Sequence, residues 1–233
     1  MKILLTLIVL LYPAVGLGIF NCVKGGSQQS EKTIPLKGES KVVLRSSYDI
    51  NIHKSHVQRV EIQGPQSLVD NLVIKAESKT LEIDEHQCTR SRELVEINVY
   101  LSELSLLKVL GASDVQIVDS FTGSRLSIDI AGAGDVVGDI NVHNLDVAIK
   151  GSGDVKLSGQ ARQVNVDVIG SGDLSALGLS SKNVYVSIKG SGNLEVSASD
   201  KLGVEIYGNG NVKYKGRPKI SMAKYGTGSI QSL

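Results

Sequence analysis

Aromatic residues are scarce in this sequence, which contains no tryptophan, two phenylalanines and seven tyrosines. So low a content disfavours a surface that stacks nucleic-acid bases or sugar rings. An excess of one charge is also lacking, because 25 Lys and Arg residues face 24 Asp and Glu residues. The chain therefore has no basic field to attract nucleic acid, and we expect no nucleic-acid partner.

A long apolar run is missing as well. Residues 3–11 are mostly aliphatic, but a membrane-spanning helix needs about 20 apolar residues. Lys2 precedes this run, and Pro13, Gly16 and Gly18 follow it. A positive start, a short apolar core and a small-residue end are typical of a secretory signal peptide. We predict a signal peptide at 1–18 and export to the periplasm, the outer membrane, the cell surface or the medium. A retained N-terminal membrane anchor is the alternative.

The sequence has two cysteines, Cys22 and Cys88. Cys22 follows the apolar run closely, as the lipidated cysteine of a bacterial lipoprotein does, although Phe20 and Asn21 replace the small residues that usually precede such a cysteine. In an exported chain the two cysteines can instead form a disulfide, and two unpaired thiols are a third alternative. The polar composition of residues 19–32 predicts a flexible tether.

From residue 33 onward, apolar and polar residues alternate with the period of two that is typical of β-strands. The stretches RVEIQG (59–64) and LVEINVYLS (94–102) show this alternation clearly. Residues 66–72 are expected to form one helical turn, and no other segment has a convincing helical period. We predict an N-terminal β-strand region at 33–110 that is continuous with the rest of the chain.

A short unit recurs in the rest of the chain: glycine, a small residue, glycine, an acid or amide, and an aliphatic residue. It occurs as GASDV (111–115), GAGDV (132–136), GSGDV (151–155), GSGDL (170–174), GSGNL (190–194), GNGNV (208–212) and GTGSI (226–230). A regular period near 20 residues indicates a solenoid, since propeller blades are about twice as long and the leucine-rich consensus is absent.

Each interval between these units carries alternating aliphatic residues, such as Val164, Val166 and Val168. Alternate residues of a strand face the same side, so each coil must stack on its neighbours to bury this stripe. We therefore predict an all-β protein in which 111–233 forms a single-stranded, right-handed parallel β-helix with coils of about 18–21 residues. Paired glycines are expected to make one sharp corner per coil: Gly132, Gly134, Gly151, Gly153, Gly170, Gly172, Gly190, Gly192, Gly208, Gly210, Gly226 and Gly228.

Four acidic residues of the repeat, Asp114, Asp135, Asp154 and Asp173, are expected to form a column along the stack. Like charges on neighbouring strands are unfavourable unless they are solvated, hydrogen-bonded or neutralised. We expect solvated side chains that accept hydrogen bonds from nearby backbone amides, as in Asx turns. A calcium site is the alternative, although later coils replace Asp with Asn or Ser and so lose charge. No cofactor is expected.

The repeat, the segment LSELSLLKVLGASDV (101–115) and the segment KYKGRPKISMAKYGTGSI (213–230) resemble the bacterial head GIN domain family, which carries the name "putative auto-transporter adhesin". Residues 60–83 also match, so the resemblance covers nearly all of 33–233. It implies an exported β-solenoid without established catalytic residues. The chain departs from the family pattern at GAS (111–113) and in its late Asn and Ser residues, which weakens a shared ligand role for the aspartate column.

Catalytic and metal-binding patterns are few. The sequence contains no GxSxG, HExxH, P-loop or dinucleotide fingerprint. His53 and His56 would face opposite sides of one strand and make a poor metal pair. Asp84, His86 and Cys88 alternate and form a weak transition-metal set. Asp146 and Asp167, on neighbouring coils, are the carboxylate pair that a glycan-cleaving enzyme would use. We expect no catalytic site.

These observations predict a non-catalytic binding, adhesion or scaffold protein of the bacterial envelope or surface, with a glycan or a protein as its partner. The open ends of a solenoid invite association with another chain. Charged residues and a proline near the last coils are expected to oppose it: Lys213, Lys215, Arg217, Pro218 and Lys219. We therefore expect a monomer, with end-to-end dimerisation as the alternative.

Overall fold

The computed structural model describes residues 22–90 and 95–233. The expected signal peptide at 1–18 and the residues Phe20 and Asn21 lie outside these ranges. The described strands all belong to one continuous hydrogen-bonded sheet. No helix in the described ranges is long and apolar enough to cross a membrane.

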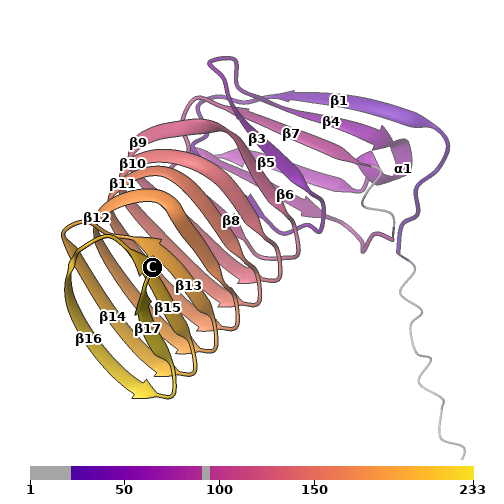
Figure 1. Ribbon diagram of the computed structural model, residues 1–233. Helices are drawn as coiled ribbons and strands as arrows, with labels where there is room; N and C mark the ends of the chain where they lie inside the picture. The colour runs from indigo at the N-terminus through magenta and orange to yellow at the C-terminus, as the bar shows by residue number, and fades with distance from the viewer. Residues whose placement is uncertain (1–21, 91–94) are drawn as a thin grey trace, which may run out of the picture.

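The predicted parallel β-solenoid is confirmed, and its coils stack along one axis (Figure 1). Gly132 pairs with Gly151, which pairs with Gly170, so the repeated units lie directly above one another. The strands of this part are β9 (Val115–Gly132), β10 (Val136–Gly151), β11 (Val155–Gly170), β12 (Leu174–Gly190), β13 (Asn193–Ser197), β14 (Lys201–Gly208), β15 (Asn211–Lys215), β16 (Lys219–Gly226) and β17 (Ser229–Ser232).

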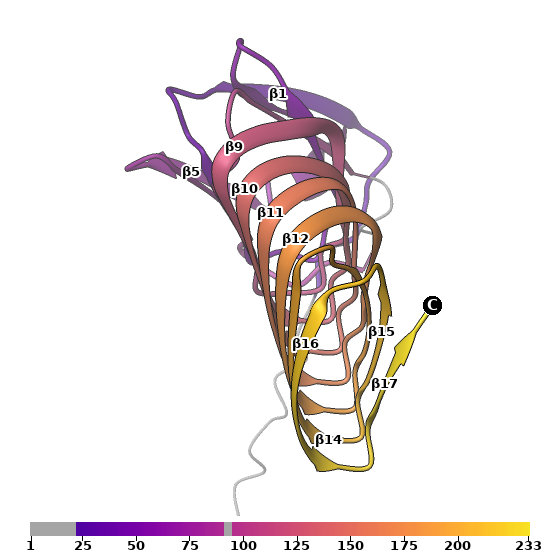
Figure 2. The ribbon, with the colours of Figure 1, turned by 60° about the vertical axis from the view of Figure 1, so that its left-hand side comes forward.

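Each of β9–β12 is one long strand that bends in its middle, which we call the arch (Figure 2). The arch lies near Phe121, Ile140, Gly159 and Leu179, which are in register with one another. The residues before the arch form wall A together with β13, β15 and β17, and those after it form wall B together with β14 and β16. The glycine corners lie at the other end of the coil from the arch.

The core lies between the two walls and consists of the predicted aliphatic stripes. Ile130, Ile149 and Val168 are each at most 1% exposed, and so are the residues that continue this column, Ile188 and Ile206. Full burial of such a side chain contributes about 1.5–3 kcal/mol. Stacking of the coils is therefore what makes the aliphatic stripe of each coil stabilising.

The N-terminal coils stack in an order that differs from their order along the chain. Strands β2 (Lys41–Leu44) and β3 (Ile50–Lys54) form a coil that lies between two later ones. On one side it pairs with β6 (Thr80–Glu85) and β7 (Glu96–Leu101), and on the other with β8 (Leu106–Val109) and the start of β9. The solenoid thus begins well before the first glycine unit at 111.

Antiparallel strands cover the first coil. Strand β4 (Arg59–Pro65) pairs with β7, β1 (Gln29–Pro35) pairs with β4, and β5 (Leu72–Glu77) pairs with β6. The predicted helical turn is present as α1 (Gln66–Val69), and it buries Leu68 and Val69. Capping strands of this kind protect the end of a solenoid.

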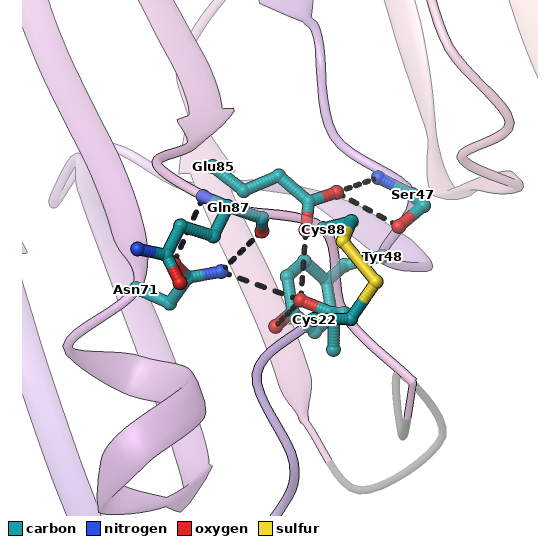
Figure 3. The surroundings of a disulfide bond; sticks show 8 residues. Cys22, Ser47, Tyr48, Asn71, Glu85, Gln87 and Cys88 are labelled. Atoms are coloured by element: carbon teal, nitrogen blue, oxygen red, sulfur yellow. Dashed lines mark hydrogen bonds between the residues drawn. A yellow bond between two sulfur atoms is a disulfide. The ribbon is translucent and has the colours of Figure 1, made fainter. Parts of the chain in front are cut away.

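The segment expected to be a tether differs from that expectation. Part of it belongs to β1, which begins at Gln29, and Cys22 forms a disulfide with Cys88 (Figure 3). The backbone amide of Val23 also donates to the carbonyl of Cys88 at 2.8 Å. No residue of β1 is buried, so its sequence shows no apolar alternation, and pairing with β4 determines the strand.

Candidate functional site

The glycine corners hold two kinds of glycine. Gly151 has a φ of +137°, which side chains rarely adopt. Gly153 does not share that conformation, but a Cβ atom on it would lie 2.3 Å from the carbonyl oxygen of Gly134 and 3.0 Å from Cγ2 of Ile130. A Cβ atom on Gly151 would also lie 2.2 Å from the carbonyl oxygen of Gly132. Both glycines therefore allow neighbouring coils to approach, and the first one also makes the turn.

The aspartate column forms a ladder of hydrogen bonds between coils. The backbone amide of Asp135 donates to Oδ1 of Asp114 at 2.9 Å, and the amides of Asp154 and Asp173 repeat this contact with the preceding aspartate at 2.8 Å. The ladder continues to Asn193, whose amide donates to Oδ1 of Asp173. Each carboxylate thus satisfies an amide of the next coil, which gives the column a structural role.

The other expected ligands do not converge on a metal. Cys88 is in the disulfide, so it has no thiolate to offer beside Asp84 and His86. His53 stacks on Tyr100, with ring centroids 4.9 Å apart, and contacts Oδ1 of Asn98 through Nε2. No group of three or more His, Cys, Asp or Glu residues in the described chain is placed to hold a metal ion.

The disulfide also concerns the lipidation alternative. The thioether of a lipoprotein needs the sulfur of Cys22, and in this structure that sulfur is bonded to Cys88.

Hydrogen bonds surround the disulfide. The buried Tyr48 hydroxyl is 3.0 Å from Oγ1 of Thr89, which donates to Glu85 at 2.8 Å (Figure 3). Burial raises the pKa of Tyr48. These contacts join the corner between β2 and β3 to the residues after β6, and the disulfide and the backbone bonds of Val23 attach the N-terminal segment at the same place.

Asp146 and Asp167 lie on the outward face of wall B, but one of them is fully engaged. Oδ2 of Asp146 accepts from Nε of Arg125 at 2.7 Å, and Oδ1 accepts from Asn165 at 2.7 Å. Burial favours the neutral form, but these two hydrogen bonds outweigh it and lower the pKa of Asp146. The arrangement holds Asp146 as an anion, which is the opposite of what a general acid needs.

The outward face of wall B also carries three exposed tyrosines near its C-terminal end. Tyr185 is 45% exposed, Tyr207 43% and Tyr225 62%. The rings of Tyr207 and Tyr225 stack, with centroids 4.9 Å apart and an angle of 10° between their planes. Three of the seven tyrosines of the chain are therefore gathered on one face, although the overall aromatic content is low.

A groove of about 530 Å³ runs across four coils of this face, and Tyr185 is the one of these three tyrosines that lines it. We call it the tyrosine groove; its outward-facing lining residues are Asn165, Asp167, Tyr185, Ser187, Gly203, Glu205, Ser221 and Ala223. Gly203 pairs with Tyr185 in the sheet, and a Cβ atom on Gly203 would lie 2.8 Å from Cδ1 of Tyr185. The tyrosine ring therefore lies over the glycine backbone, and small residues leave the groove open.

The chemistry of this groove suits an amphipathic ring-shaped ligand. The Tyr185 ring offers a flat apolar surface, and Asp167, Ser187 and Glu205 offer acceptors beside it. A sugar ring presents an apolar face of C–H groups and a rim of hydroxyl donors, which matches both features. The scarcity of aromatic residues suggested that no such surface exists, because composition does not show where the few tyrosines lie.

Part of this groove was visible in the sequence. Asp167, Tyr185, Ser187 and Glu205 all stand at positions that alternate with the buried stripe, so their outward orientation follows from the period of two. These residues meet because of Gly203 and because of which residues of β12 and β14 pair with each other. The number of residues per coil varies along the solenoid, and it decides this pairing. No local pattern carries that information.

Comparison with known proteins supports the fold over nearly the whole chain. A "putative adhesin" from Bacteroides fragilis NCTC 9343 is 25% identical, with a TM-score of 0.86 over 91% of this chain and 100% of that one. A "putative adhesin" and a "putative lipid binding protein", both from Parabacteroides distasonis ATCC 8503, are 21% and 22% identical, each with a TM-score of 0.76 over the same shares. No curated protein matches the sequence.

The family model described as "Putative auto-transporter adhesin, head GIN domain" matches residues 40–218. This range contains the N-terminal coils, six of the seven glycine units and the tyrosine groove except for Ser221, Met222 and Ala223 at its far edge. The resemblance noted in the sequence is thereby confirmed, and the chain belongs to the head GIN domain family.

Proposed function

We propose that this protein is an exported, non-catalytic adhesion module of the bacterial envelope or surface, and that it binds the sugar rings of a glycan in the tyrosine groove. The observation that carries the proposal is Tyr185, a 45% exposed ring that lies over Gly203 beside the row of acceptors Asp167, Ser187 and Glu205. The family description and the names of the similar structures agree with an adhesive role.

Two features support export and the absence of catalysis. The disulfide between Cys22 and Cys88 is of a kind that persists in oxidising compartments outside the cytoplasm. The carboxylate of Asp146 is held by two structural hydrogen bonds, which favour its anionic form over that of a general acid. A stiff solenoid that holds a groove on one wall suits binding without chemical conversion.

The proposal is tested with the purified protein and an array of neutral oligosaccharides, followed by calorimetry on the best ligand. Replacing Tyr185 by Ala removes the ring, and we expect an affinity about tenfold lower, or ~1.4 kcal/mol. Replacing it by Phe keeps the ring and is expected to preserve most of the affinity. Val137→Ala is the control, because Val137 is similarly exposed but lies on wall A.

Two results would contradict the proposal. If the protein binds no neutral oligosaccharide on the array, the groove is not a glycan site. If binding occurs but Tyr185→Ala weakens it no more than Val137→Ala, the ligand contacts another part of the molecule. Thermal unfolding of each variant shows whether a loss of binding is a loss of folding.

A further inference from the structure

A second groove lies on the far side of the coils, next to the arch and away from the tyrosines. It has a volume of about 530 Å³ and crosses β10, β11 and β12 before it reaches the segments around β13 and β15. Its cationic lining residues are Arg162, Lys182 and Lys215, with His143 at the first coil. We call it the basic groove.

Two cations of this groove, Arg162 and Lys182, are stacked in register with His143. Val142 pairs with Ala161, which pairs with Ser181, and these three buried residues form the floor. The residues that follow them, His143, Arg162 and Lys182, are all exposed and occupy equivalent positions on successive coils. Neighbouring strands are about 4.8 Å apart, so the groove presents a row of basic groups at that spacing.

Some cations elsewhere on the solenoid have ion pairs, whereas others, such as Lys150 and Lys189, have none with a residue of the described chain. Arg45 pairs with Glu82, Arg125 with Asp146 and Lys213 with Glu195, in each case across neighbouring strands. None of His143, Arg162, Lys182 and Lys215 has an ion pair with a residue of the described chain. The row continues with an acid, because the amide of Asp200 donates to the carbonyl of Lys182 and Lys201 pairs with Asn183. The carboxylate of Asp200 accepts from Ser199, and that of Asp139 accepts from Ser158.

A row of like charges on adjacent strands is unfavourable unless something neutralises it. The aspartate column at the opposite end of the coil is relieved by its hydrogen bonds to backbone amides. Arg and Lys are donors only, so they need carbonyl or anionic acceptors. Lys54 and Arg59 donate to backbone carbonyls, but Arg162, Lys182 and Lys215 have no such bond within the described chain. The basic groove therefore lacks the anionic partner that would complete it, and its hollow shape leaves room for one.

We infer that the basic groove binds an acidic polysaccharide, a chain whose successive sugars carry carboxylate or sulfate groups. The spacing of the coils is close to the length of one sugar unit, so one polymer running along the solenoid axis can place an anion at each of several coils. Gln160, Ser180 and Ser199 also line the groove and supply hydrogen-bonding groups for hydroxyls.

Other anionic partners fit the groove less well. Its described lining contains no Phe, Tyr or Trp on which unstacked bases of a single-stranded nucleic acid would lie. A lipid bilayer presents a broad surface to amphipathic elements that insert apolar side chains, whereas here the cations surround a hollow floored by buried residues. The site is separate from the tyrosine groove, so the inference does not depend on the proposed function.

The test uses the purified protein and four immobilised probes at physiological salt: polygalacturonate, a sulfated glycosaminoglycan, neutral dextran and single-stranded DNA. We expect binding to at least one of the two acidic polysaccharides and none to dextran. The double variant Arg162→Ser with Lys182→Ser is expected to weaken that binding about tenfold or more and to reduce its salt dependence.

The matched control is Lys150→Ser with Lys189→Ser, which removes the same charge from exposed positions on wall B. It should change the affinity less than about twofold, as distant rim charges do. Equal losses in the two double variants would show general attraction to net charge and overturn the inference. Preference for DNA over both polysaccharides, or no binding to either polysaccharide, would also overturn it.

Tyr185→Ala separates the two sites. It is expected to leave binding of the acidic polysaccharide unchanged, while the basic-groove variant leaves binding of a neutral oligosaccharide unchanged. Loss of acidic-polysaccharide binding in Tyr185→Ala would place that ligand in the tyrosine groove and refute the basic groove as its site. Failure of the neutral array alone would refute the proposed function without affecting this inference.

Discussion

At the scale of single residues, the corner aspartates show how a repeated acid can be structural. The carboxylate of Asp154 accepts from the amide of Asp173, and the amide of Asp154 donates to Asp135. The acceptor oxygen matters in this arrangement, and the negative charge does not. In the same column the amide oxygen of Asn211 accepts from the backbone amide of Ser229 without a charge, whereas the oxygen of Asn193 accepts from the side-chain amide of Asn211.

This view predicts opposite effects of two substitutions at Asp154. Asp154→Ala removes the acceptor for the amide of Asp173, and we expect the free energy of unfolding to fall by about 1 kcal/mol. Asp154→Asn keeps an acceptor and reduces repulsion between neighbouring carboxylates, so stability should be unchanged or higher. Urea unfolding of the two variants beside the parent protein measures both effects.

A calcium site in the column predicts something different. Calcium would then raise the unfolding midpoint of the parent protein, and Asp154→Asn would lose that increase together with part of the ligand set. Our expectation is a midpoint that does not respond to calcium in either protein. A calcium-dependent midpoint in the parent alone would show that the charge has a role that the ladder does not explain.

Residues that face outward were the least predictable. The inward position of Val164, Val166 and Val168 follows from alternation alone, and all three are buried. Alternation also indicates that Tyr185 faces outward, but any polar or aromatic residue would satisfy it equally well. The tyrosine groove and the basic groove arise from which outward residues meet across coils, and this depends on register over intervals that vary from 18 to 21 residues.

At the scale of strands and coils, the regular part of the solenoid was predictable because three signals coincide there. Glycine pairs, the acid or amide after them and the aliphatic stripe recur together, and the structure stacks them as expected. The N-terminal coils lack these signals. The corner at 45–49 contains Ser46, Tyr48 and Asp49 in place of the glycine unit, so nothing in its sequence indicates a corner.

The order of those coils was also beyond local pattern. The coil of β2 and β3 lies between coils formed by residues that follow it by tens of positions. Such pairing is decided by long-range contacts, including the disulfide between Cys22 and Cys88, which are separated by 66 positions in the chain. The disulfide fixes the N-terminal segment to the corner between β6 and β7 (Figure 3).

We therefore expect this disulfide to stabilise the capped end of the solenoid. Replacing both cysteines by Ser should lower the free energy of unfolding by about 2–4 kcal/mol, because the loop that the disulfide closes is long. The midpoint of thermal unfolding reports the change. A reducing agent should lower the midpoint of the parent protein toward that of the double variant and leave the variant unchanged. An identical midpoint for reduced and oxidised parent protein would contradict the expectation.

At the scale of the whole molecule, the two ends of the solenoid are unlike. Strands β1, β4 and β5 cover the N-terminal end, whereas β16 and β17 are the last strands at the other end (Figures 1 and 2). Ile220 and Met222 continue two buried columns of the core, pairing with Leu202 and Val204, yet they are 45% and 50% exposed. An end of this kind can recruit a strand from another molecule.

Lys224 is the feature that opposes such association. It pairs with the buried Ile206 and so occupies the next position in an aliphatic column, where a charge disfavours stacking of a further coil. Inward-pointing charges at sheet edges are a known protection against edge-to-edge pairing. Lys213 and Lys219, two of the cations singled out in the sequence, lie at exposed positions outside the aliphatic columns. Lys224 therefore adds a charge at a position that belongs to the core.

The expected monomer can be tested at this position. Light scattering should show a monomer for the parent protein at micromolar concentration, and Lys224→Ile should associate because it extends the apolar end with Ile220 and Met222. Lys224→Arg is the control; it keeps the charge and should remain monomeric. If the parent protein already forms a stable dimer and Lys224→Glu dissociates it, the exposed end is an interface in solution. Lys224 would then contribute to binding between copies, and the protection argued for it would be wrong.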